Sequence, residues 1–361
     1  METLNNVVLT IQNYMSNYIL VIALLGAGLW FSIRLGFIQV RGFGESMRRT
    51  FGGLFSKKGA AGKDGMSSFQ ALATAIAAQV GTGNIAGAAT ALAIGGAGAI
   101  FWMWIAAFLG MATIYAEALM AQKYKTVGAD GQVTGGPVYY IRAAFKGTFG
   151  KVLAALFAIL ITLALGFMGN AVQSNSIAAA FHTAFGIPQW IMGLVVAVIA
   201  IFVFMGGMKR IAKVTETIVP FMAALYIIGS LIVIIYNYKN IPYAFASIFI
   251  GAFSPSSVVG GAAGATVKLA LTKGVARGLF SNEAGMGSAP NAAATADVSH
   301  PVQQGLIQTL GVFTDTIVIC SCTAFIILLY PTHMETGLTG IELTQAALSA
   351  HIGPIGNIFI A

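Results

Sequence analysis

The stretch Ala78-Gln79-Val80-Gly81-Thr82-Gly83-Asn84-Ile85 interrupts an apolar run that extends from about residue 67 to 94. Gly81 and Gly83 make departure from a helix less costly. An open backbone in lipid finds no water, so an interrupted helix must line a cavity or be buried in protein. Freed carbonyls such as that of Val80 suit a cation, and freed N–H groups suit a carboxylate. The break therefore predicts a binding site, to which three polar side chains contribute: Gln79, Thr82 and Asn84.

Close helix packing is the alternative explanation of this break, because Gly83 and Gly87 form a G-x-x-x-G pattern. Packing alone does not require Gln, Thr and Asn at the interruption. The string is also not a dinucleotide fingerprint, since it reads G-x-G-x-x-x-G and follows a helix rather than a strand.

The composition places most of the chain in lipid. Of the 361 residues, 57% are apolar and 8% are charged, whereas soluble domains carry about 25% charged residues. A soluble enzyme, a nucleic-acid binder and a disordered scaffold are all excluded on these grounds. The net charge is +8, and the basic residues lie in short loops between apolar runs. This pattern is typical of residues that orient a membrane protein, not of a nucleic-acid-binding surface.

Eight apolar runs are long enough to cross a bilayer, which takes about 20 residues per helix. The fold is therefore predicted to be an all-α polytopic membrane protein. The predicted spans are residues 17–38, 67–94, 98–123, 150–180, 189–207, 213–237, 244–272 and 303–330.

The basic residues predict the orientation of these spans. Of the 19 Lys and Arg residues, all except Lys239 are predicted to lie on one side of the membrane. This set includes Lys268, Lys273 and Arg277. The positive-inside rule assigns that side to the cytoplasm and the N-terminus to the outside of the plasma (inner) membrane. Glu2 stands where a signal peptide would be basic, so no cleavable signal is expected.

A second interruption is predicted within span 244–272. Pro255 removes a backbone donor there, and neighbouring hydroxyls and an aromatic ring complete a candidate substrate site. The alternative is a simple proline kink. The candidate residues are Phe253, Ser254, Ser256 and Ser257, with Phe167 and Met168 expected to limit the size of the pocket.

The order of the spans predicts two inverted repeats of five helices, because the two breaks lie in helices of opposite direction. Residues 1–40 form an extra N-terminal helix, 67–237 the first repeat, and 244–361 a second repeat cut short after its second span. Residues 278–301 are expected to form a cytoplasmic connection, and 340–351 a short outer helix. The apolar run that begins at Ile355 and stops at Ala361 favours a fragment.

Polar residues inside two other spans join the candidate site. Asn170, Gln173 and Ser174 share one helix face, although interhelical hydrogen bonding would also explain them. Thr314 and Asp315 offer oxygen ligands for sodium, although pairing inside the bundle is the alternative. Glu117 is expected to pair with a loop cation, and Cys320 and Cys322 to pack inertly.

Residues 95–104 read Gly-Gly-Ala-Gly-Ala-Ile-Phe-Trp-Met-Trp. This string closely resembles the signature of the sodium:alanine (alanine or glycine:cation) symporter family, as do residues 79–84 and 281–288. The resemblance implies an inverted five-helix repeat like that of the bacterial leucine transporter. It also implies symport of sodium with alanine or glycine, with residues 81–84, Asn170, Gln173 and 253–257 around the substrate.

These expectations leave two alternatives: a proton-coupled amino-acid permease, and an inactive fragment of such a symporter. Neither a pore ring of charge nor a nucleophile with a matched base is apparent, so a channel and an enzyme are disfavoured. Sodium is expected as a co-substrate, with no other cofactor and no obligate protein partner.

Overall fold

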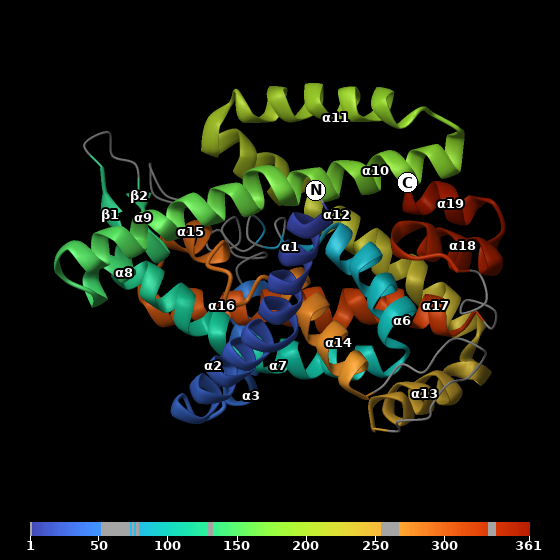
Figure 1. Cartoon of the computed structure of the whole chain (residues 1–361), viewed down its shortest axis with the longest axis horizontal. Helices are drawn as coiled ribbons and strands as arrows, with labels where there is room; N and C mark the ends of the chain where they lie inside the picture. Colours follow the sequence, from blue (N-terminus) through green and yellow to red (C-terminus); the bar gives the residue numbers. More distant parts are fainter. Residues whose placement is uncertain are drawn as a thin grey trace.

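The computed structural model of the chain describes residues 2–51, 73, 76, 79–128, 133–253, 267–330 and 337–361. Helix α7 (Gly98–Lys123) lies at the centre of the bundle (Figure 1), and its most extensive contacts are with four helices. These are α2 (Leu20–Arg34), α13 (Ile241–Phe253), α14 (Val267–Asn282) and α16 (Pro301–Val312). The central position suits α7 because its buried positions are mostly glycine, alanine and other small residues, which allow helices to approach closely.

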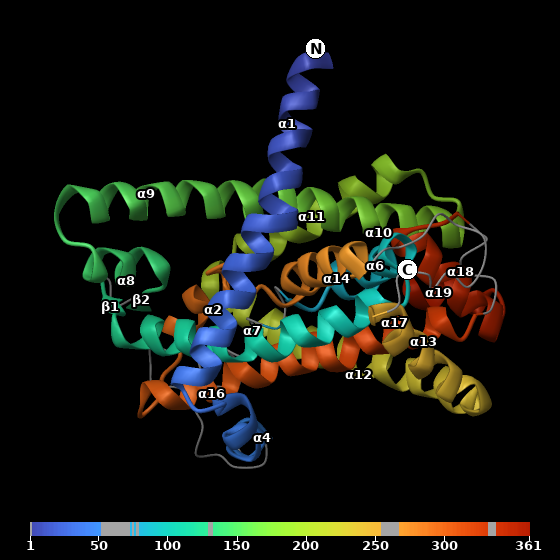
Figure 2. The same ribbon diagram turned by 60° about the horizontal axis from the view of Figure 1, so that its bottom comes forward.

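The N-terminal segment forms a long rod. Helix α1 (Glu2–Tyr14), the π-helical turn η1 (Met15–Ile19) and α2 follow one another directly, and the N-terminal end projects away from the other helices (Figure 2). Two short helices come next, α3 (Ile38–Arg41) and α4 (Phe43–Phe51). Phe43 packs edge-on against Phe313 at a centroid distance of 4.9 Å, which attaches α4 to the bundle.

A second long helix covers one face of the bundle (Figure 1). It consists of α9 (Gly147–Leu163), η4 (Ala164–Gly169) and α10 (Asn170–Phe185), and α11 (Gln189–Phe204) and α12 (Gly207–Tyr236) follow it. In the most apolar stretch of helix 147–185, only 6% of the residues are buried. In the corresponding stretch of helix 301–328, 72% are buried. The long helix thus presents an apolar surface suited to lipid, while 301–328 belongs to the core.

The remaining elements complete the chain. A hairpin of two antiparallel strands pairs Thr126 with Thr134, a small exception to the all-α prediction. The elements are η3 (Gly83–Gly87), α6 (Ala88–Gly95), β1 (Thr126–Val127), β2 (Val133–Thr134), α8 (Pro137–Ala144), η5 (Tyr238–Asn240), α15 (Ala289–Ala294), η6 (Phe313–Cys320), α17 (Ser321–Leu328), α18 (Gly340–Ile352) and α19 (Ile355–Ile360).

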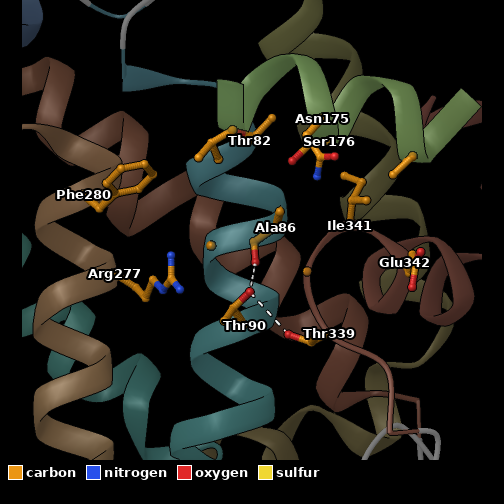
Figure 3. Close-up of a pocket in the computed structure, with 14 residues that line it drawn as sticks. Thr82, Ala86, Thr90, Asn175, Ser176, Arg277, Phe280, Thr339, Ile341 and Glu342 are labelled. Atoms are coloured by element: carbon orange, nitrogen blue, oxygen red, sulfur yellow. Dashed lines mark hydrogen bonds between the residues drawn. The ribbon is translucent and has the colours of Figure 1, made fainter. Parts of the chain in front are cut away.

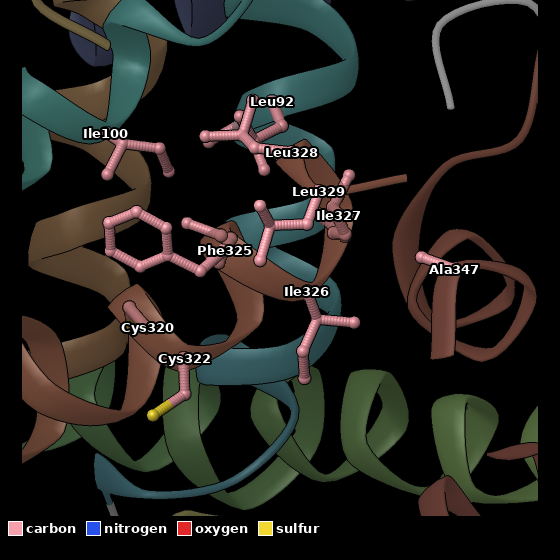
Figure 4. Close-up of a cluster of buried hydrophobic side chains, with 14 of the residues drawn as sticks. Leu92, Ile100, Cys320, Cys322, Phe325, Ile326, Ile327, Leu328, Leu329 and Ala347 are labelled. Carbon is pink, nitrogen blue, oxygen red and sulfur yellow. The ribbon is translucent and has the colours of Figure 1, made fainter. Parts of the chain in front are cut away.

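The largest hydrophobic cluster joins α6, α7, α17 and α18 (Figure 4). Leu92, Ile100, Ile327 and Leu348 are each no more than 1% exposed and come from these four helices in turn. Because lipid is as apolar as these side chains, van der Waals packing rather than escape from water holds the cluster together. The cluster fixes α6 and α17, and with them the two π-helical turns that precede these helices in the chain.

Five helices are long and apolar enough to cross a membrane: Asn5–Arg34, Gly98–Lys123, Gly147–Phe185, Arg210–Tyr236 and Pro301–Leu328. They confirm five of the eight predicted spans. Gly83–Gly95 and Gln189–Phe204 are shorter apolar helices in the places of two others. The chain is accordingly an integral membrane protein, and most of residues 67–78 lie outside the described part.

The predicted span 244–272 is wrong. A Cβ added at Gly251 of α13 would lie 2.7 Å from the backbone nitrogen of Gly98, and one added at Gly274 of α14 would lie 2.2 Å from the carbonyl oxygen of Ala99. Both helices therefore meet the same, N-terminal end of α7, whereas one spanning helix would place these residues apart. An apolar run in sequence does not distinguish a helix that crosses the bundle from one that lies at its end.

Residues 278–301 were expected to form a cytoplasmic connection with partial helix; the partial helix is present as α15 (Ala289–Ala294), but the segment is not confined to one end of the bundle. A Cβ added at Gly110, halfway along α7, would lie 3.1 Å from the Cβ of Ala284. Further on, the amide nitrogen of Gln122 donates to the carbonyl oxygen of Ala296 at 2.9 Å, at the other end of α7. The segment from α14 through α15 thus runs the length of α7, with Arg277 toward the N-terminal end.

This path changes the charge distribution as well. Lys273 lies beside Gly95, near the N-terminal end of α7, whereas Lys123 ends that helix and Lys125 follows it. The prediction that Lys268, Lys273 and Arg277 lie on the same side as the other basic residues is therefore wrong. The remaining asymmetry of charge still favours the end of the bundle that holds Lys123 and Lys125 as the cytoplasmic one.

Candidate functional site

The predicted interruption of the helix near Gly81 is present. Gln79 is helical, Val80 and Gly81 are not, and the chain resumes a π-helical path at Gly83. The N–H of Gly81 donates to Oδ1 of Asn84 at 2.8 Å. The Asn84 side chain thus replaces a main-chain carbonyl as the acceptor of this N–H. Single π-helical turns of this kind occur frequently at functional sites.

Asn84 connects this break to a distant helix. Its Nδ2 donates to Oδ1 of Asp315 at 2.7 Å and to the main-chain carbonyl of Asp315 at 3.0 Å. Both residues are fully buried. Asp315 lies in η6, another π-helical turn, near the middle of the helix Pro301–Leu328. Of the four residues predicted to bind sodium, Val80, Asn84, Thr314 and Asp315, two are thus in direct contact.

The second oxygen of the Asp315 carboxylate accepts two hydroxyl hydrogen bonds. Oγ of Ser281 donates to Oδ2 at 2.9 Å, and Oγ1 of Thr316 donates to it at 2.7 Å. All donors to this carboxylate are neutral side chains, those of Asn84, Ser281 and Thr316. A buried carboxylate surrounded by oxygen atoms and without a basic partner is well suited to a hard cation.

The second described break lies between α14 and α15, and Pro255, where a break was predicted, lies outside the described residues. Glu283, Gly285 and Gly287 have φ values of 55°, 90° and 85°, so the backbone leaves the helix there. Asn282 stabilises this break: its Oδ1 accepts from the N–H of Ala284 at 3.1 Å, and its Nδ2 donates to Oγ1 of Thr316 at 3.2 Å. Asparagine followed by two closely spaced glycines was the signal for it, although the sequence had assigned these residues to a loop.

The two breaks face each other in the middle of the bundle. A Cβ added at Gly83 would lie 3.2 Å from Cα of Ser281, so glycine here favours the close approach of the end of α14, which leads into the second break. Two facing breaks were predicted, but with Phe253–Ser257 as the partner. Ser254, Ser256 and Ser257 lie outside the described residues, and Phe253 is 59% exposed and packs on Phe101.

A cavity of about 440 Å³ adjoins the first break. Gln173 enters it from α10, and a Cβ added at Gly81 would lie 2.9 Å from Oε1 of Gln173. The cavity is large enough for a small ligand, and apolar residues of other helices make up much of its wall. The residues that line it include Val80, Gly81, Thr82, Asn84, Ile85, Gln173, Ser176, Met222, Tyr226, Ile319 and Ile341.

Several predicted site residues lie elsewhere. Asn170 is exposed and donates to the carbonyl of Gly166 at 2.9 Å, so the face of α10 that meets the cavity carries Gln173 and Ser176 instead. Phe167 and Met168 are exposed and do not line the cavity. Gln79 is buried, but its side-chain amide has no hydrogen-bond partner among the described residues.

Three further residues differ from expectation. Cys320 is not inert packing alone, because its Sγ lies 3.4 Å from Nδ2 of Asn84 and 3.3 Å from Oγ of Ser281. Glu117 accepts the backbone N–H of Gly285 at 3.1 Å rather than pairing with a cation. Thr314 is half-buried, while Thr316 makes the contact with Asp315. Spacing along a helix could not distinguish the two threonines, because η6 does not have the α-helical period.

The two threonines provide a test of this geometry. Thr316→Val removes a donor to the Asp315 carboxylate, a charge-assisted bond that contributes about 1.5–3 kcal/mol. We expect it to raise the sodium concentration for half-maximal amino-acid binding about tenfold or more. Thr314→Val is expected to cause less than a threefold change. Equal effects of the two variants in sodium titrations of the purified protein would contradict the placement.

Known proteins resemble this chain along its whole length. Residues 1–361 match the sequence profile of the sodium:alanine symporter family. The probable sodium/glutamine symporter GlnT of Bacillus subtilis is 47% identical over 360 residues, which cover 100% of this chain and 73% of GlnT. The amino-acid carrier protein AlsT of the same organism is 49% identical over 339 residues, which cover 94% and 69% of the two chains.

A third relative comes from an archaeon. The sodium/alanine symporter AgcS of Methanococcus maripaludis is 42% identical over 356 residues, covering 97% of this chain and 77% of AgcS. Matches of this extent, together with the helical breaks and the buried polar centre, leave no doubt about the family. The chain belongs to the sodium:alanine symporter family, whose members are transporters and not enzymes.

Proposed function

We propose that this protein couples entry of a small neutral amino acid, alanine or glycine, to entry of sodium. The observation that carries this proposal is the contact of 2.7 Å between Asn84 and Asp315 at the facing breaks. Sodium would be held by the Asp315 carboxylate, the Asn84 side chain and freed carbonyls such as that of Val80. The names of AgcS and GlnT, which include sodium, support this choice of ion.

The amino acid would lie in the 440 Å³ cavity beside the same break. Its carboxylate would meet the N–H groups near Gly81–Gly83, where a helix begins and its dipole favours negative charge. Gln173 and Thr82 would add hydrogen bonds. Ile85, Ile319 and Tyr226 line the cavity, so the apolar space favours a short side chain.

The wider arrangement in the membrane forms part of the same proposal. The chain would form an extra N-terminal helix (1–40), a first five-helix repeat (67–237) and an inverted second repeat within 244–361, as in the bacterial leucine transporter. The protein would lie in the plasma membrane with its N-terminus outside. Rocking of one group of helices against the other would then expose the shared centre to either side in turn.

Uptake into proteoliposomes tests the proposal. Radiolabelled alanine is offered with an inward sodium gradient, with potassium in place of sodium, and with an imposed proton gradient alone. One charge moved through 100 mV provides about 2.3 kcal/mol, enough for about 50-fold accumulation. We expect sodium to be required. Uptake that follows the proton gradient and ignores sodium would instead support a proton-coupled permease, and glutamine as a competitor tests the substrate size.

Asn84→Ala provides the residue-level test. Loss of an amide that donates to a buried carboxylate is expected to raise the sodium requirement about tenfold or more. Asn237→Ala, at the end of α12 and outside the cavity, provides a matched asparagine control. An Asn84→Ala variant with unaltered sodium dependence would remove this residue from the cation site.

A further inference from the structure

A second cavity lies on the other side of Thr82. It encloses about 270 Å³ and shares Thr82, Ser176 and Ile341 with the larger cavity (Figure 3). Its floor is one face of η3 and α6, including Ala86 and Thr90, and α10 and α14 form two of its walls. The second cavity is therefore the immediate neighbour of the proposed amino-acid site.

Arg277 is the basic residue of this second cavity. It is half-buried, and the described residues include no acidic or hydrogen-bonding partner for its guanidinium. Arg277 precedes Asn282 by five residues, which is about 7.5 Å along a helix. A guanidinium at this depth is costly unless it meets a counter-charge, so Arg277 makes this cavity favourable for an anionic group.

The chemistry of the walls defines what the second cavity can bind. Arginine presents a planar fork of donors that matches a carboxylate and repels sodium. Hydroxyl groups of Thr82 and Ser176 line the same space. Glu342, at the start of α18, lies on the opposite side of the cavity from Arg277 (Figure 3) and offers a negative charge to an ammonium group. A positive wall facing a negative one suits a zwitterion.

We infer that the second cavity is a separate binding site for the amino-acid substrate, in which Arg277 holds the carboxylate before the substrate passes Thr82 to the sodium-dependent site. The inference rests on the proposed function for the identity of the substrate. It adds a sodium-independent step, because Asp315 is not among the residues that line the second cavity.

Protection of an introduced cysteine tests this site directly. Thr90→Cys places a thiol on the floor of the cavity, and the native cysteines are buried. The rate of its alkylation by a water-soluble reagent is measured on the purified full chain in nanodiscs, without sodium. We expect alanine to slow the reaction and alaninamide, which lacks the carboxylate, to have no effect. Equal protection by both compounds would overturn the inference.

Variants of Arg277 complete the test. Arg277→Gln is expected to raise the alanine concentration for half-protection about tenfold, and Arg277→Lys to have an intermediate effect, since it keeps the charge without the fork. Lys273→Gln, one turn earlier on α14 and outside the cavity, is the matched control and should behave as the parent. Monodisperse elution of each variant confirms that it is folded.

The outcomes separate this inference from the proposed function. Sodium-dependent alanine uptake together with unchanged protection in Arg277→Gln would overturn the inference and leave the symport proposal intact. Loss of protection in Arg277→Gln, without sodium-dependent uptake, would support the second site and contradict symport. If alanine gave no protection of Thr90→Cys in the parent chain, the second site would not bind it and the inference would fail.

Discussion

Asp315→Asn is expected to reduce the affinity for sodium about 100-fold while the protein stays folded. The replacement has nearly the same shape, but it carries no charge and its amide nitrogen cannot accept the hydrogen bonds that a carboxylate oxygen accepts. Asp315 accepts from Asn84, Ser281 and Thr316 in the present arrangement. Loss of the charge weakens both these bonds and the attraction for a cation, about 3 kcal/mol in total, which corresponds to about 100-fold.

Two measurements check this result. Sodium titration of alanine binding to the purified protein gives the affinity, and the thermal unfolding midpoint gives the stability. Asp315→Ala serves as the more disruptive comparison, because it leaves the buried donors without an acceptor at a cost of about 1–3 kcal/mol each. A chain with Asp315→Asn that binds sodium as well as the parent would show that the carboxylate is a structural pairing group and not a cation ligand.

Gly274→Val is expected to abolish binding by separating α14 from α7. A Cβ at this position would lie 2.2 Å from the carbonyl oxygen of Ala99 and 2.8 Å from Cβ of Trp102. Neither neighbour can withdraw without moving the backbone, so α14 must shift. A displacement of about 1 Å at a site typically costs about 100-fold in function. Ser281 and Asn282 follow on the same helix and would lose their contacts with Asp315 and Thr316.

Gly26→Val is the matched control for this substitution. Gly26 lies on α2, and a Cβ added there would meet no atom within 4 Å. The same residue change should therefore leave amino-acid binding and the unfolding midpoint near the parent values. If Gly274→Val bound alanine as tightly as Gly26→Val, the close approach of α14 to α7 would not be required for the site.

The sequence was most informative where a local rule applied. Low charge and long apolar runs required lipid as the solvent, and glycines at residues 81 and 83 required a break, because backbone cost is a property of the residue itself. Asp315 attracted attention for the same reason: a carboxylate within a spanning segment is costly wherever the segment lies. These features needed no knowledge of the neighbouring helices.

The sequence was least informative about which segments pack against each other in the bundle. Residues 244–272 are apolar but do not form one crossing helix, and residues 281–288 are small and polar but lie in the core beside Gly110. Polarity along the chain could not reveal that a second break replaces one turn of a crossing helix. Likewise, Thr314 was predicted beside the Asp315 carboxylate, but the π-helical turn η6 places Thr316 there.

Sequence alone therefore determined the solvent, the helical class, the family and the first break, because composition and glycine content act on each segment separately. Tertiary structure alone decided which break faces the first, which hydroxyls reach Asp315 and where Arg277 lies. Those outcomes depend on how closely α14 packs on α7, and that distance is fixed by small residues on two helices far apart in the chain.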